Sequence, residues 1–221
     1  DLDDYLRRQG IAGIREIDTR TLTLTLREKG TMNGMITAGP DYDLEACLKK
    51  IHAFQSVNPV ARVSRKHVSR YPAGAQGRTS RLPGDARPSE SMTLMPFTVD
   101  PSITARYKVA VLDYGIKQNI VWNLTQRGCD VTVYPHDTPA DVILAEKPDG
   151  IMLSNGPGDP ADCVDILPEV RKLFDSGTPV FAICLGHQLI ALATGARSRR
   201  LKYGHRGINH PVKDLEADRV Y

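Results

Sequence analysis

Cys184 stands at the junction between an apolar run and a helical pattern. Residues 179–188 read PVFAICLGHQ, so the apolar run stops at the thiol and a glycine follows two residues later. This order predicts a strand, a sharp turn and a helix, the arrangement that presents the nucleophile in many hydrolases. The helix dipole would favour the thiolate, and the Leu185 amide would face a developing oxyanion. Taken alone, the segment also fits a buried cysteine that ends a core strand.

A second apolar run ends in a glycine-rich turn. Residues 151–160 read IMLSNGPGDP. Gly156 and Gly158 allow the backbone to approach a ligand closely and leave amides free to donate hydrogen bonds. Such a turn alone is typical of an ordinary strand-to-helix loop, but beside the Cys184 turn it favours a shared catalytic crevice.

The second half of the chain alternates apolar strands with helical patterns, which predicts a parallel sheet. Strands are expected at 109–112, 131–134, near 151 and near 180, and helices at 116–127, 138–146, about 162–175 and 185–195. Thr138 is placed to cap the second of these helices. We therefore predict an α/β fold with a doubly wound, mostly parallel sheet. Ligands bind beyond the carboxyl ends of such strands, so Gly156 and Cys184 can face one crevice.

The first part of the chain predicts part of a smaller α+β domain. Helical patterns cover 2–9, 18–29 and 44–54, and a strand is expected at 32–37. Asp18 is placed to cap the second helix and Gly30 to end it. Residues 60–106 carry weak periodicity and many chain breakers. The predicted division is 1–60 for the N-terminal domain, 61–107 for an irregular linker and 108–221 for the catalytic domain.

The formal net charge of +3 comes from one stretch without acids, while the rest of the chain is net negative. Its bases are Arg62, Arg65, Lys66, Arg70, Arg78 and Arg81. Such a stretch can bind nucleic acid or an acidic partner, but Tyr71 is its only aromatic residue. We interpret it as a solvated linker and expect no nucleic-acid partner.

The four cysteines lack the paired spacing of a zinc site or the density of a disulfide framework. Reduced thiols in the cytoplasm are the simpler interpretation. No apolar run is long enough to span a membrane, so no membrane association is expected.

Several segments together resemble a known family. SNGPGDP at 154–160 and ICLGHQ at 183–188 are similar to the two signature segments of class I, triad-type glutamine amidotransferases. Other stretches resemble, within that class, the small chains of carbamoyl phosphate synthetases. They are EIDTR at 16–20, LREKG at 26–30, NG at 33–34, DYGIKQNI at 113–120 and YGHRGINHPVK at 203–213.

The resemblance implies a glutamine-hydrolysing subunit with Cys184 as its catalytic nucleophile. Gly156, Gly158, Leu185 and Gln188 would bind the substrate glutamine. Ammonia would pass to a large synthetase subunit, which makes carbamoyl phosphate for pyrimidine and arginine biosynthesis. That partner would hold ATP and Mg, whereas this chain needs no cofactor or metal.

In the family, the general acid and its orienting carboxylate form a His-x-Glu motif, which this sequence does not contain. We therefore expect an internal part of a longer protein, with negligible glutamine turnover by itself. His136, after a predicted strand, stays open as an alternative base, whereas His187 is expected only to pack or hydrogen-bond.

Two other functions stay open. A non-catalytic module would keep the amidotransferase fold and the partner surface without a triad. An amidotransferase of guanylate or anthranilate type is disfavoured by the N-terminal segments through Gly34. A continuation of the gene past Tyr221 into His-x-Glu would separate the catalytic from the non-catalytic interpretation.

Overall fold

The computed structural model describes residues 1–37, 41–77, 97–199, 201 and 211–221. The predicted positions Arg78, Arg81 and 203–210 lie outside these residues. Two compact units emerge: Asp1–Gln55 with Arg199–Tyr221, and Ser56–Ser198. The second unit contains both segments for which chemistry was predicted.

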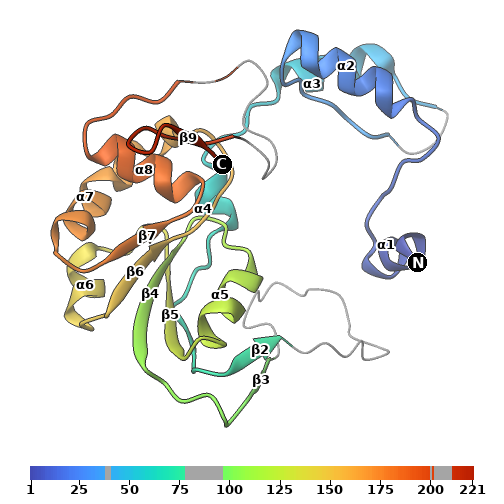
Figure 1. Ribbon diagram of the computed structural model, residues 1–221. Coiled ribbons are helices and arrows are strands. Elements are labelled where there is room, and N and C mark those ends of the chain that lie inside the picture. The colour runs from blue at the N-terminus through green and yellow to red at the C-terminus, as the bar shows by residue number, and fades with distance from the viewer. Residues whose placement is uncertain (38–40, 78–96, 200, 202–210) are drawn as a thin grey trace. The chain divides into compact units, whose positions relative to one another are not determined.

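A five-stranded sheet of order β1-β5-β4-β6-β7 forms the centre of the second unit (Figure 1). Its strands are β1 (Ser69–Tyr71), β4 (Tyr107–Asp113), β5 (Cys129–Pro135), β6 (Gly150–Leu153) and β7 (Val180–Ala182). Strands β5, β4, β6 and β7 are parallel, and β1 joins β5 in antiparallel register. The predicted α/β fold with a mostly parallel sheet is confirmed.

Helices cover both faces of this sheet, as Figure 1 shows. One face carries α5 (Gln118–Thr125). The other carries α6 (Ala140–Ala145), the 3₁₀ helix η1 (Pro160–Ile166), α7 (Leu167–Asp175) and α8 (Leu185–Ala193). Each face has its own apolar core, one around Val121 and Val131 and one around Leu153 and Leu189. Burial on both sides explains why the central strands are continuous apolar runs.

The helix of the second unit that we expected Thr138 to cap begins differently. Pro139 occupies the N-cap position of α6, and the Thr138 hydroxyl instead donates to the Pro135 carbonyl at 2.9 Å. The Ala140 amide donates to the Glu169 carboxylate of α7 at 2.7 Å. A tertiary contact thus supplies the cap that the local sequence suggested.

The segment predicted as an irregular linker contains regular structure. It holds α4 (Pro59–Val63), β1 and a hairpin of β2 (Ala75–Gly77) with β3 (Phe97–Val99). Tyr71 of β1 is buried, and its ring lies 5.4 Å from Trp122 and 5.6 Å from Phe97. The prediction was wrong here because strands of three residues are too short to show a period in the sequence.

The first unit consists of short helices and one small hairpin. Its elements are α1 (Leu2–Gln9), α2 (Thr19–Lys29), α3 (Leu44–Ala53), β8 (Lys213–Asp214) and β9 (Arg219–Val220). Asp18 caps α2 and Gly30 ends it, as predicted. The expected strand at 32–37 does not form. Instead, the side-chain amide of Asn33 donates to the Ile51 and Phe54 carbonyls at the end of α3. None of the three helices has a buried residue.

Candidate functional site

Cys184 occupies a strained turn between β7 and α8. Its backbone has φ 52° and ψ −109°, a conformation that a residue with a Cβ rarely adopts, and it forms the N-cap of α8. Such strain costs about 1–3 kcal/mol and persists only where the surroundings enforce it. The side chain is exposed, in contrast to the buried Cys129 and Cys163. The predicted strand, turn and helix are therefore confirmed, and a buried cysteine at this position is ruled out.

The backbone of Leu153, the last residue of β6, and of Ser154, which follows it, enforces this turn. The Ile183 amide donates to the Leu153 carbonyl at 3.0 Å, and the Gly186 amide donates to the Ser154 carbonyl at 3.1 Å. A Cβ on Gly186 would overlap the Leu153 carbonyl oxygen. The first turn of α8 thus lies directly against β6. These contacts hold the backbone of Cys184 in its strained conformation.

Gly156 lies in the turn that follows β6 and contacts the start of α8. A Cβ at this position would overlap the Tyr114 carbonyl oxygen and would lie 2.7 Å from Leu185 Cδ2. Only glycine fits such a close approach. The structure therefore brings Gly156 and Leu185 together, although they are far apart in sequence.

The backbone amides of Gly156 and Leu185 are available as donors. Neither donates a hydrogen bond within the described part of the chain. Two free amides beside an exposed thiol are the components that stabilise a tetrahedral oxyanion in acyl transfer. The geometry can thus support nucleophilic attack on an amide or ester carbonyl.

The other predicted substrate-binding residues lie around this turn. Gly158 is exposed, with φ +94°, and a Cβ there would lie 2.5 Å from Pro59 of α4. Gln188 is exposed on the first turn of α8, where its backbone amide donates to the Cys184 carbonyl at 3.1 Å. Their roles in binding substrate stay predictions.

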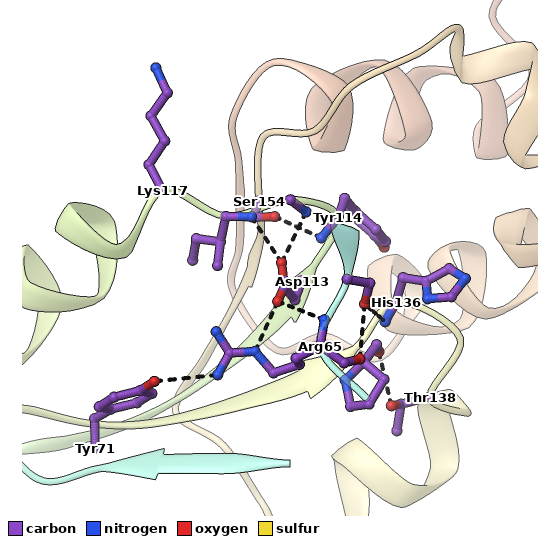
Figure 2. Close-up of polar contacts among 12 residues, drawn as sticks. Arg65, Tyr71, Asp113, Tyr114, Lys117, His136, Thr138 and Ser154 are labelled. Atoms are coloured by element: carbon purple, nitrogen blue, oxygen red, sulfur yellow. Dashed lines mark hydrogen bonds and ion pairs between the residues drawn. The ribbon is translucent and has the colours of Figure 1, made fainter. Parts of the chain in front are cut away.

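A buried polar network supports the glycine turn, and the sequence analysis assigned it no role. Asp113, at the end of β4, accepts hydrogen bonds from Arg65, Gly115 and Ile116. The Ser154 hydroxyl accepts from the Tyr114 amide at 2.9 Å (Figure 2). An acid that ends a buried strand in the DYG run is the sequence signal that could have revealed this network.

Arg65 contradicts the interpretation of the basic stretch as a solvated linker. Its side chain is 13% exposed, and its Nε lies 2.8 Å from the carboxylate of the buried Asp113. Arg70 pairs with Glu146 at 3.4 Å on the surface, and the Lys66 ammonium donates to the Ala61 carbonyl. The stretch is therefore partly folded against the sheet, and its described bases do not form one free cationic patch.

His136 lies too far along the sheet to act directly on Cys184. It follows β5, and two strands, β4 and β6, separate β5 from β7. Strands are spaced by about 4.8 Å, so the two strand ends are about 14 Å apart. Direct proton transfer requires hydrogen-bond distance. The His136 Nδ1 is instead buried without a hydrogen bond in the described structure, 3.7 Å from Asp137.

Burial is the main cause of the raised pKa of two other ionisable side chains, Cys163 and Tyr114. Desolvation raises the pKa of the Cys163 thiol, and the neighbouring Asp162 carboxylate adds to the effect. Desolvation also raises the pKa of Tyr114, whose hydroxyl is buried without a partner among the described residues. Both groups are buried and neutral at physiological pH, whereas the side chain of Cys184 is exposed.

Among the described residues there is neither a metal-binding cluster nor a membrane-spanning helix. Within the described ranges, no cluster of three or more His, Cys, Asp or Glu side chains could hold a metal ion. In that part of the chain, no helix has the length and apolarity needed to cross a membrane.

Two family models match the chain. The model described as "Glutamine amidotransferase class-I" matches residues 110–221, which include both turns. The model described as "Carbamoyl-phosphate synthase small chain, CPSase domain" matches residues 1–36.

Curated relatives that match nearly the whole chain include two carbamoyl phosphate synthase small chains. The carbamoyl phosphate synthase small chain of Photorhabdus laumondii subsp. laumondii is 43% identical over 99% of this chain and 54% of that protein. The protein of the same description from Escherichia coli (strain K12) is 42% identical over 100% of this chain and 55% of its own length. The chain thus spans about half the length of the curated relatives it matches.

Among the solved structures that match the chain, one covers about half of it. It is a GMP synthase component from Thermoplasma acidophilum, 28% identical, with a TM-score of 0.38. The match covers 48% of this chain and 50% of that chain.

Proposed function

The chain belongs to the carbamoyl phosphate synthase small chain family, and from this premise we propose that the whole protein hydrolyses glutamine to supply ammonia to a synthetase subunit. One observation carries the proposal. The exposed thiol of Cys184 stands in a strained turn beside two amides that are free within the described structure, those of Leu185 and Gly156.

The proposed reaction begins with attack of the Cys184 thiolate on the carboxamide carbon of glutamine. The carbonyl oxygen becomes an oxyanion, which the amides of Leu185 and Gly156 stabilise. Loss of one such donor costs about 2.7–4 kcal/mol of transition-state stabilisation in comparable sites. Gly158 and Gln188 are proposed to hold the remainder of the substrate.

Collapse of the tetrahedral intermediate breaks the carbon–nitrogen bond. The departing nitrogen takes a proton and leaves as ammonia, and a glutamyl thioester remains on Cys184. Water then hydrolyses the thioester to glutamate and restores the thiol. We propose that a His-x-Glu segment elsewhere in the whole protein supplies the proton, because His136 follows β5, which is separated from β7 by two strands.

The proposed partner is the large synthetase subunit, which the description "small chain" of the relatives implies. That large chain would use bicarbonate and ATP with Mg to make carbamoyl phosphate for pyrimidine and arginine biosynthesis. Four free cysteines fit a reducing compartment, so we place the proposed heterodimer in the cytoplasm.

The test is ammonia release from glutamine by the whole protein with its large subunit. We expect Cys184→Ala to abolish release and to prevent trapping of radiolabelled glutamyl thioester. Cys47→Ala, on α3, is the matched control and should keep wild-type activity. Activity that survives Cys184→Ala would refute the proposal. A wild-type protein that binds its partner without hydrolysing glutamine would instead favour a non-catalytic module.

A further inference from the structure

The carboxylate of Asp113 is a buried charge for which the proposed chemistry has no use. Asp113 is 4% exposed at the carboxyl end of β4. Its Oδ2 accepts from Arg65 Nε at 2.8 Å and from the Arg65 amide at 3.2 Å. Its Oδ1 accepts from the amides of Gly115 and Ile116 at 2.9 and 2.8 Å. Four donors satisfy this anion, so it is built into the fold.

Arg65 reaches this carboxylate from outside the parallel strands. It follows α4, and in Figure 2 its guanidinium lies between Asp113 and the Tyr71 hydroxyl, to which it donates at 3.5 Å. The other end of α4 contacts the glycine turn, because Pro59 Cγ would lie only 2.5 Å from a Cβ of Gly158. The segment from Pro59 to Arg65 is therefore held at both ends near the candidate site.

The loop that Asp113 organises touches Gly156 directly. The Asn155 side chain donates to the Gly115 carbonyl at 3.0 Å and accepts from the Lys117 amide at 3.4 Å. The Tyr114 amide donates to the Ser154 hydroxyl, and the Tyr114 carbonyl oxygen packs against Gly156 Cα so closely that a Cβ would overlap it. A shift of residues 114–117 would consequently move the Gly156 amide.

We infer that Arg65 and Asp113 are positioning residues for glutamine hydrolysis, because their ion pair fixes the loop that sets the Gly156 amide. This inference rests on the proposed function. Donors to an oxyanion act only when they lie at hydrogen-bond distance from where the charge develops. A misplacement of about 1 Å can cost roughly 100-fold in rate. The loss should fall on kcat rather than KM, since the amide acts in the transition state.

The main experiment measures glutamine kinetics in the whole protein with its large subunit. We expect Arg65→Met to lower kcat by roughly 10–100-fold with KM changed less than about threefold. Arg65→Lys, which keeps the charge, should recover part of the loss. Arg70→Met removes a surface arginine whose ion pair with Glu146 is exposed, and it should leave kcat unchanged.

Asn155→Ala provides a second variant that creates no buried charge, so it should fold even if Arg65→Met does not. It removes the tie between the loop and the glycine turn, and we expect kcat to fall about tenfold, well within the loss that misplacement can cause. An unchanged kcat in Asn155→Ala, or in folded Arg65→Met, would overturn the inference.

Two further measurements separate positioning from a purely structural role and from failure of the proposed function. Amide hydrogen exchange at 113–117 and 154–158 should accelerate in Arg65→Met, whatever reaction the protein catalyses. Alkylation of Cys184 by iodoacetamide should keep its rate, because displacement at a saturated carbon forms no oxyanion. Unchanged exchange would overturn the inference. If the wild-type protein does not hydrolyse glutamine but amide exchange is still faster in Arg65→Met, the proposed function is refuted. The inference that Arg65 positions the glycine turn would then still stand.

Discussion

The turn after β6 and the turn after β7 lie side by side at the carboxyl edge of the sheet, yet they are held in different ways. The turn at Ser154–Gly156 exchanges hydrogen bonds with the neighbouring loop: the Tyr114 amide donates to the Ser154 hydroxyl, and the Asn155 side chain donates to the Gly115 carbonyl. Its most crowded position is a glycine. The turn at Cys184 instead holds a residue with a Cβ at φ 52°, and backbone hydrogen bonds to the Leu153 and Ser154 carbonyls enforce this conformation.

The difference follows from what each turn has to present. A turn that offers a backbone amide can use glycine and gain its rigidity from neighbours. A turn that offers a side chain must keep the Cβ and accept the strain. The two turns therefore differ in which substitutions they should tolerate.

The largest effect is expected for Gly156→Ala. The added Cβ would overlap the Tyr114 carbonyl oxygen and crowd Leu185, so the Gly156 amide must move. We expect glutamine hydrolysis by the whole protein to fall roughly 100-fold or more. Gly150→Ala is the control, because its Cβ would come no closer than 3.7 Å to another group. Similar rates for the two variants would show that the close approach at Gly156 does not matter.

Ser154→Ala should weaken the same turn by removing a buried acceptor. The Tyr114 amide would lose its partner at 2.9 Å in a site where Ser154 is fully buried. An unsatisfied buried donor costs about 1–3 kcal/mol of stability. Urea unfolding followed by circular dichroism measures this cost. Ser56→Ala, at an exposed position whose hydroxyl makes no hydrogen bond among the described residues, should change stability by less than about 0.5 kcal/mol. Equal effects would mean that the Ser154 hydroxyl has no special role.

At the other turn, Cys184→Gly should be more stable than Cys184→Ala. Glycine relieves strain of about 1–3 kcal/mol at this φ, while its greater freedom in the unfolded chain costs about 0.5–1 kcal/mol. We expect a net gain of about 1 kcal/mol, measured as a shift in the urea midpoint. The same pair of changes at Cys47, inside α3, should give the reverse order. An alanine variant as stable as the glycine variant would argue against strain at Cys184.

The smallest effect is expected in the alkylation rates of Cys184, in the turn after β7, and of Cys163, in the helix that follows the turn after β6. Cys184 is exposed, whereas burial raises the pKa of Cys163, in η1, and of Cys129. Near pH 7, limited alkylation with mass mapping should label Cys184 first. A raised thiol pKa delays thiolate formation, so labelling of Cys163 should grow only as the pH rises past the ordinary value of 9.0. Preferential labelling of Cys129 or Cys47 near pH 7 would contradict the assignment of the nucleophile.

Local patterns accounted for much of the second unit. The alternation of apolar runs and helical spacing predicted the parallel strands, and the position of Cys184 between such runs predicted its turn. These features are local, because a strand's apolar run and a helix's spacing lie within about ten residues. The closeness of Gly156 to Leu185 followed only in outline, from the rule that parallel strands end at one edge.

What the sequence by itself determined is the order of the elements, the family and the thiol at a strand end. Tertiary structure decided the partners that complete the site. Asp113 binds Arg65 from 48 residues away, and β1 joins β5 as an edge strand of only three residues. The strand order also excludes His136 as the base for Cys184, because β4 and β6 lie between β5, which His136 follows, and β7. Strand order and the pairing of buried charges depend on contacts between distant segments, and no local periodicity encodes them.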